Sequence, residues 1–256
     1  MASHNTAERR SYIIQVLQDQ GHASVSALSD KLGVSEVTIR KDIHFLEQRN
    51  LLIRTHGGAV LVDGYVSDQP FEEKSTRNAE EKRRIGAAAA GMVADGETLI
   101  LDSGSTTLQI ARNLRNKKGL IVATASVHIA MELLRIPNID VLMLGGLIRP
   151  NSGAVVGSYA EMMLRDHAFQ KLFLAGDGFD VGYGLTTTNT MEAHLNRLMM
   201  ASSRQTIAVV DSSKIGRRGL SRICGAEEID TLIIDSGVSE DTVNRLEDLG
   251  VNVMVV

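Results

Sequence analysis

The stretch VSEVTIRKDIHFLEQRNLLIRTHGGA, residues 34–59, decides the N-terminal fold. Ser35 is a good helix N-cap, and the residues after it repeat with helical spacing to about residue 49. At about 100° per residue, one side of this helix carries Ile39, Ile43 and Leu46. A second side carries Val37, Arg40, Lys41 and His44. The stretch therefore predicts a helix that packs by one face and presents cations on the other.

The residues before this helix predict two more helices. An amphipathic pattern over residues 7–19 ends at Gly21, and Ser24 caps a short second helix that runs to Leu32. Gly33 supplies a tight turn before Ser35. Two short helices joined by a turn, after a first helix, are the order of a helix-turn-helix unit.

Two apolar runs after the third helix predict a β-hairpin. Leu51–Ile53 and residues 59–62 have strand character, and His56, Gly57 and Gly58 lie between them. A hairpin directly after a helix-turn-helix is a wing, and it would carry Arg54 and His56. A turn histidine without a partner is an equal interpretation of His56.

The exposed cations are placed as in a protein that binds DNA. Arginine or lysine in the first turns of a recognition helix can donate to guanine O6 and N7 in the major groove, which suits Arg40 and Lys41. Ser35 and Thr38, at the helix N-terminus, suit a phosphate. The alternative is a solvated face in which the cations pair with Glu36, Asp42 or Glu47. Residues 1–60 hold seven lysines and arginines against six acids, in a chain whose net charge is −4.

The remaining sequence predicts a larger α/β domain. Residues 63–78 are polar and are interpreted as a linker, so the predicted domains are 1–62 and 79–256. From residue 80 on, continuous apolar runs alternate with helical stretches, which indicates a parallel sheet covered on both faces. The runs are 98–101, 120–123, 141–144, 172–175, 206–210, 232–234 and 251–256.

Small polar loops follow several of these strands. In open α/β sheets, ligands bind beyond the carboxyl ends of the strands, so these loops predict one shared pocket. Asp102-Ser103-Gly104-Ser105-Thr106-Thr107 joins a strand to a helix, where free N–H groups and hydroxyls suit a phosphate, although the same residues also cap helices. The other candidate residues are Gly145, Gly146, Arg149, Asp177, Glu192 and Lys214.

Each of these candidates has a second interpretation. Lys214 and Arg149 suit a phosphate but could equally be surface cations. Asp102 and Asp177 could accept hydrogen bonds from sugar hydroxyls or cap their loops. Glu192 lies in the first turns of a helix, where an acid is favoured by the helix dipole alone.

Nearly the whole chain resembles the DeoR-type bacterial transcriptional repressors. The resemblance rests on Ser35-x2-Thr38-Ile39-Arg40-Lys41-Asp42-Ile43, on Arg54-x-His56-Gly57-Gly58, and on the segments LDSGSTT, GDGFD, GLTTTN and DSSK. It implies a winged helix-turn-helix domain and a sensor domain similar in fold to the pentose phosphate isomerases. It also implies operator DNA and a phosphorylated sugar or sugar alcohol as partners, with the operon of a carbohydrate pathway as the target.

Two positions depart from the family pattern. Lys41 stands where arginine is more usual, which keeps the charge but loses the bidentate fork. Ala125 stands where asparagine is frequent, which removes an amide from that strand end. A sugar-phosphate isomerase with an added DNA-binding domain is the alternative function, but Val181-Gly182-Tyr183-Gly184 lacks the lysine that those enzymes carry there. A domain that only oligomerises is a third possibility.

Composition excludes several other classes. Cys224 is the only cysteine, so an internal disulfide and a multi-cysteine metal site are excluded, and no cofactor or metal is expected. No signal peptide or membrane span is visible, which predicts a cytoplasmic protein. Because paired helix-turn-helix units read two half-sites, a homo-oligomer is expected, either dimer or tetramer.

Overall fold

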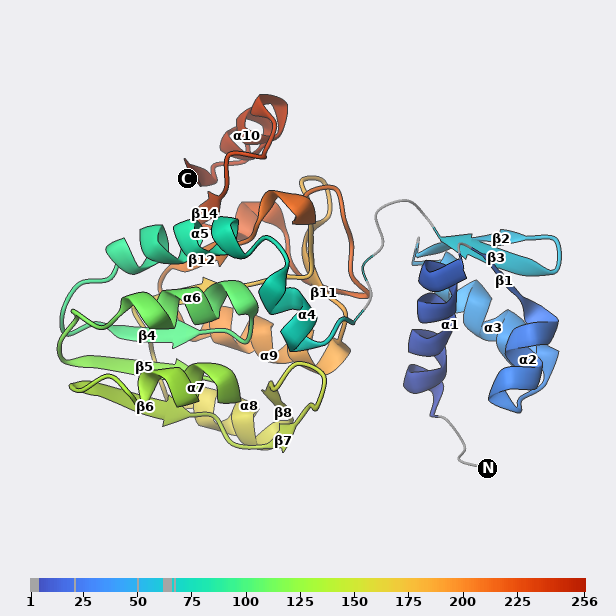
Figure 1. Ribbon diagram of the computed structural model, residues 1–256, viewed down its shortest axis with the longest axis horizontal. Coiled ribbons are helices and arrows are strands. Elements are labelled where there is room, and N and C mark those ends of the chain that lie inside the picture. The colour runs from blue at the N-terminus through green and yellow to red at the C-terminus, as the bar shows by residue number, and fades with distance from the viewer. Residues whose placement is uncertain (1–4, 21, 50, 62–65, 67) are drawn as a thin grey trace.

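The computed structural model describes residues 5–20, 22–49, 51–61, 66 and 68–256. These form an N-terminal helical domain and a larger α/β domain (Figure 1). No helix within the described ranges is both long and apolar enough to cross a membrane.

The N-terminal domain has the predicted helix order and a wing. Its elements are α1 (Thr6–Gln20), β1 (His22–Ser24), α2 (Val25–Leu32), α3 (Glu36–Glu47), β2 (Leu52–Thr55) and β3 (Gly58–Leu61). Ser24 caps α2, and Gly33 ends it in the left-handed conformation at φ 64°. The sheet order is β1-β3-β2, so a short strand that the sequence pattern does not reveal completes the wing. Residue 62, the predicted end of the domain, lies outside the described residues.

The segment interpreted as a linker contains a helix. Within residues 63–78, α4 (Phe71–Thr76) forms one and a half turns, with Phe71 buried against the sensor domain. The predicted linker therefore contains a helix that the sequence pattern does not reveal, because a single aromatic anchor stands where a periodic apolar pattern would signal one.

The second domain is built on a seven-stranded parallel sheet, as the apolar runs predict. Its order is β15-β14-β12-β9-β4-β5-β6. The strands are β4 (Thr98–Leu101), β5 (Leu120–Thr124), β6 (Ile139–Met143), β9 (Lys171–Leu174), β12 (Thr206–Val209), β14 (Thr231–Ile234) and β15 (Asn252–Val255). The chain builds outward from β4 through β5 to β6 and then continues from β9 on the other side of β4, so the strand order reverses between β4 and β9. That switch point is where an open α/β sheet leaves a crevice.

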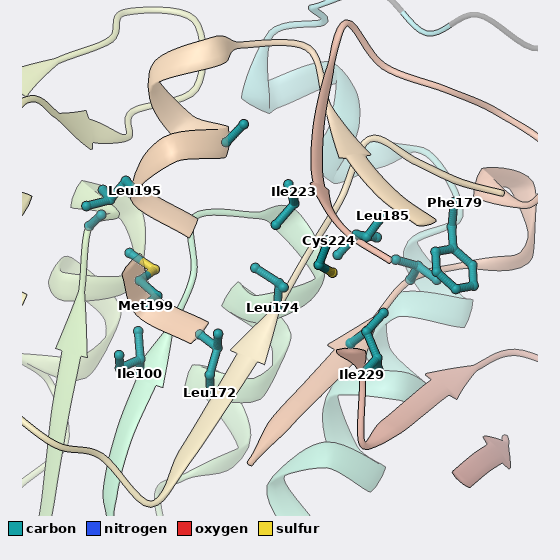
Figure 2. Packing of buried hydrophobic residues seen from close by; sticks show 14 of the residues in the cluster. Ile100, Leu172, Leu174, Phe179, Leu185, Leu195, Met199, Ile223, Cys224 and Ile229 are labelled. Carbon is teal, nitrogen blue, oxygen red and sulfur yellow. The ribbon is translucent and has the colours of Figure 1, made fainter. Parts of the chain in front are cut away.

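Helices cover both faces of the sheet. One face packs under α5 (Ala79–Gly91), α6 (Ser105–Asn113) and α7 (Val127–Leu133). The other packs on α8 (Ser158–Arg165), α9 (Thr190–Ala201) and α10 (Glu240–Glu247). Successive strand residues alternate between the two cores: Leu99 and Leu101 face the first, and Ile100 faces the second. Figure 2 shows the second core, where Ile100, Leu172 and Met199 lie together.

Smaller elements complete the domain around the sheet. They are the pair β7 (Leu147–Ile148) and β8 (Val155–Val156), the antiparallel strands β10 (Gly178–Asp180), β11 (Gly184–Thr187) and β13 (Ser221–Cys224), and the 3₁₀ turns η1 (Ser212–Lys214) and η2 (Ala226–Glu228). Gly184 is required where β11 pairs with β13, because its φ is +102° and an added Cβ would lie 1.9 Å from the Cys224 carbonyl oxygen.

Candidate functional sites

Helix α3 has the two faces that its spacing predicts. Ile39, Ile43 and Leu46 are fully buried. The Ser35 hydroxyl caps the helix by accepting from the Thr38 N–H at 3.2 Å. The remaining candidates on this helix are exposed: Val37, Arg40, Lys41 and His44. The helix thus packs by one side and presents a cationic surface on the other.

The alternative interpretation pairs these cations with Glu36, Asp42 or Glu47, and the structure shows only some of these pairs. Arg40 does pair with Glu36 at 2.6 Å, but both side chains are about half exposed or more. An exposed i,i+4 pair is worth only about 0.3–0.5 kcal/mol, so a DNA phosphate or base can replace Glu36. Asp42 is buried and instead bonds Arg9 and Arg10 of α1. His44 lies 3.3 Å from Glu47.

The wing places its two candidates in solvent. Arg54 and His56 are exposed at the end of the β2–β3 hairpin. Gly57 turns the chain at φ +84°, and Gly58 lies so close to β1 that a Cβ would be 2.2 Å from the Ala23 carbonyl oxygen. The hairpin and α3 therefore form the two exposed parts that a winged helix-turn-helix uses on DNA.

A polar cavity lies beyond the carboxyl ends of β4, β9 and β12, which are adjacent in the sheet. Eight of the twelve predicted effector residues line it: Asp102, Ser103, Gly104, Ser105, Thr106, Asp177, Glu192 and Lys214. The other lining residues are Phe71, Lys74, Lys82, Ser152, Ala175, Gly176, Thr187 and Asn196. The cavity occupies the switch point of the sheet.

Asp177 is the most strongly held acid of this cavity. Its carboxylate accepts from the Lys74 ammonium at 2.6 Å, from the Thr187 hydroxyl at 2.9 Å, and from the N–H and hydroxyl of Thr188 at 3.0 Å each. Although burial raises the pKa of Asp177, the Lys74 charge and these donors hold that pKa well below its usual value. Asp177 is therefore a fixed negative charge in the cavity wall.

Three lysines bring positive charge to the same cavity. Lys74 comes from α4, Lys82 from α5 and Lys214 from η1. Burial lowers the pKa of Lys82 to about 8, and burial also lowers the pKa of Lys214. Lys82 donates to the carbonyl oxygens of Lys74 and Arg77. The sequence analysis missed Lys82, although its spacing from Ile85 and Ala89 places it on the buried face of α5.

Asp102 lies at the floor of the cavity. It is 2% exposed and accepts from the N–H groups of Ser103 at 2.6 Å and Ala175 at 3.1 Å. Burial raises the pKa of Asp102 to about 8 despite these donors. Asn196, with its amide oriented to donate, reaches the same carboxyl at 3.1 Å.

The raised pKa of Asp102 predicts a pH-dependent stability. Between the unfolded value near 3.8 and about 8, the folded chain holds a proton that the unfolded chain releases, so stability should fall as the pH rises through that range. The slope for one group is about 1.4 kcal/mol per pH unit at most. Asp102→Asn should flatten the slope, as measured by urea unfolding at pH 5 to 9. Equal slopes in the two proteins would contradict the assignment.

Four predicted residues do not line the cavity. The Thr107 hydroxyl donates to the carbonyl oxygens of Asp102 and Gly104 and so holds the loop. Gly145 and Gly146 follow the edge strand β6, two strands away from β4, and Gly146 allows close contact with β8. Arg149 bonds Asp68 at 2.6 Å and also the lining residue Glu192. Ala125 is buried and is not among the lining residues.

The fold and the two sites define a DNA-binding transcriptional regulator with a sensor domain. The DeoR-like helix-turn-helix domain matches residues 9–64, and the DeoR C terminal sensor domain matches residues 77–236. The chain belongs to the DeoR family. This confirms the regulator interpretation over the isomerase alternative.

Individual relatives match along the full chain. A putative aga operon transcriptional repressor of Escherichia coli O157:H7 is 40% identical over 98% of this chain and 94% of its own length. The transcriptional regulator GlpR of Haloferax volcanii is 37% identical over 97% of both chains. Among solved structures, a D-ribose-5-phosphate isomerase bound to phospho-erythronic acid matches 53% of this chain and 54% of its own, at 17% identity and a TM-score of 0.40.

Proposed function

We propose that this protein represses a carbohydrate utilisation operon and leaves its operator when a phosphorylated sugar or sugar alcohol binds the cavity. The observation that carries the proposal is the cavity itself, in which three lysines and the N-terminus of α6 surround a site that also holds carboxyl and amide groups. The name of the E. coli relative, a putative operon repressor, supports the same function.

The cations suit the phosphate end of such an effector. Lys82 is buried and Lys214 is half-buried, and burial lowers the pKa of both, so a dianion would stabilise their charged forms. The loop Ser103-Gly104-Ser105 begins α6, where N–H groups and the helix dipole favour an anion. A phosphate bound here would gain charge-assisted hydrogen bonds from lysines and backbone together.

The acids and amides suit the hydroxyl end. Asp102, Glu192 and Asn196 all line the cavity. Carboxylates accept hydrogen bonds from hydroxyl groups, and a protonated Asp102 can also donate one. An effector that combined a phosphate with several hydroxyls would therefore match both halves of the cavity.

A ligand screen tests this function. Thermal unfolding of the full chain should shift upward with one or more of the pentose, ketose, hexitol and amino-sugar phosphates, and it should not shift with the corresponding unphosphorylated sugars, because ligand binding to the folded state stabilises it. The ligand that raises the melting temperature should also weaken operator binding, since effector binding and DNA binding change each other's affinity by the same factor. The absence of any shift, or a shift without an effect on DNA, would contradict the proposal.

The DNA side makes its own prediction. Arg40→Ala should weaken specific operator binding by roughly 1–3 kcal/mol, the range for a good base contact, because Arg40 lies exposed on the first turns of α3. Titration of a labelled operator fragment measures the loss. Arg83→Ala, which removes an exposed arginine of α5, is the control and should leave the affinity unchanged. An unchanged operator affinity in Arg40→Ala would refute the groove assignment.

The expected homo-oligomer belongs to the same proposal. Two half-sites about one helical turn apart require two helix-turn-helix units in a fixed relation, so we infer that the DNA-bound form is at least a dimer.

A further inference from the structure

Residues 68–78 connect the two domains and also form part of the cavity wall. We call this segment the strap. It follows the wing, whose last strand ends at Leu61, and it contains α4. Its residues Phe71 and Lys74 line the cavity. In Figure 1, α4 lies on the side of the sensor domain that faces the N-terminal domain.

The strap is held by one buried apolar side chain, which belongs to a core of the sensor domain, and by several polar contacts. Phe71 stacks on His128 with the ring centroids 3.8 Å apart, and it is the only buried residue of the strap. Asp68 pairs with Arg149 at 2.6 Å and accepts from the Thr188 hydroxyl at 3.2 Å. Lys74 pairs with Asp177 at 2.6 Å. A segment held mainly by polar contacts can be released when other polar groups compete for its partners.

The polar partners of the strap are shared with the cavity. Arg149 bonds Asp68 through one guanidinium nitrogen and Glu192, a cavity residue, through the other. The Thr188 N–H donates to Asp177, and the Thr188 hydroxyl lies within hydrogen-bond distance of both Asp68 and Asp177. Lys74 is itself a cavity cation. A phosphate that attracts Lys74, or a hydroxyl that engages Glu192, therefore acts directly on the bonds that dock the strap.

A second connection runs in parallel. The loop after Lys214 is fixed beside the cavity, since the Gly219 N–H donates at 2.8 Å to the hydroxyl of Thr186, the neighbour of the lining residue Thr187. Its Arg218 carbonyl oxygen accepts from the Val66 N–H at 3.1 Å, and Leu220 packs on the core of the N-terminal domain. The position of the N-terminal domain thus depends on two segments that both begin at the cavity.

Resting on the proposed function, we propose that the strap is the switch between the two sites. The docked strap is the DNA-binding state. Effector phosphate draws Lys74 from Asp177, the pairs around Arg149 rearrange, and the strap leaves its docked position. In a paired assembly, this displaces each recognition helix and alters the spacing that two half-sites demand. Each single recognition helix remains intact.

The test uses Asp68→Asn in the full-length protein without effector. Asp68 is not among the cavity-lining residues, so the change weakens docking without removing a lining group. The DNA is a two-half-site operator selected from a random pool by the wild-type protein, together with a fragment that holds a single half-site. We expect at least about tenfold weaker binding to the two-half-site operator, within the usual range of allosteric coupling, and nearly unchanged binding to the single half-site.

Two matched variants complete the experiment. Glu72→Gln makes the same kind of charge change at an exposed position of the strap and should match the wild type. Asp68→Glu keeps a carboxylate for Arg149 and should restore most of the operator affinity. Thermal unfolding monitors the folded state of every variant.

The outcomes separate the strap from the proposed function. If Asp68→Asn binds both DNA fragments like the wild type, the strap is not the switch, while the regulator function stands. If it loses both fragments equally, the spacing mechanism is overturned. If the wild-type protein selects no specific sequence, or no sugar phosphate weakens its operator binding, the proposed function fails and the strap proposal fails with it.

Discussion

Replacing Asp42 by alanine is expected to destabilise the N-terminal domain by about 3–5 kcal/mol, the usual cost of removing one partner from a buried ion pair. Asp42 is 2% exposed and lies 2.5 Å from Arg9 and 2.8 Å from Arg10. Arg9 is itself nearly buried, at 9% exposure. The substitution removes the buried carboxylate that Arg9 and Arg10 share.

The ion pairs of Asp42 join the first and third helices of the N-terminal domain. Asp42 is on α3 and the two arginines are on α1, so the ion pairs fix the recognition helix against the first helix. Urea unfolding followed by far-ultraviolet circular dichroism should show an early transition for the N-terminal domain in Asp42→Ala. Asp30→Ala, which removes an exposed acid of α2, is the matched control and should change stability by less than about 0.5 kcal/mol. Equal stability of the two variants would show that the cluster contributes nothing.

Local patterns were sufficient to predict most of the framework. Each of the seven parallel strands follows from a continuous apolar run, because a strand buried on both faces needs no alternation. The helix-turn-helix follows from the caps Ser24 and Ser35 and the turn at Gly33, which act within a few residues. These signals depend on neighbours in the chain, and a single sequence contains them.

The elements that were missed depend on contacts between distant residues. Strand β1 exists because residues 22–24 pair with β3, about 35 residues further on. Helix α4 forms where Phe71 stacks on His128 and Lys74 pairs with Asp177. Neither partner is visible from the polar composition of residues 63–78, so the segment resembles a linker until the fold brings its partners together.

For the cavity, too, local signals were readable in the sequence and the long-range arrangement was not. Loops after β4, β9 and β12 were placed correctly, because the carboxyl ends of parallel strands share one edge. The order of the strands decides which loops meet there, and the sequence does not state that order. This is why Gly145 and Gly146, after the edge strand β6, were included in the predicted site although the structure places them outside the cavity lining.

Lys214→Met is expected to weaken binding of the phosphorylated effector by roughly 10- to 100-fold, the equivalent of one charge-assisted hydrogen bond. Lys214 lines the cavity, and burial lowers its pKa although Asp177 and Asp211 partly offset that effect. Because burial disfavours its charged form, Lys214 lowers the stability of the protein without effector. Its replacement by an uncharged chain of similar length should therefore leave the melting temperature without effector equal or higher.

This combination distinguishes a ligand-binding lysine from a structural one. Lys74 also lines the cavity, but the ion pair with Asp177 raises its pKa despite burial, so Lys74→Met should lower stability as well as binding. Lys118→Met, an exposed position before β5 at the opposite edge of the sheet, is the control for both variants. Calorimetric titration with the sugar phosphate that the thermal screen selects measures the affinities. A Lys214→Met protein that binds this compound like the wild type, or that is clearly less stable when empty, would show that Lys214 supports the fold and does not bind phosphate.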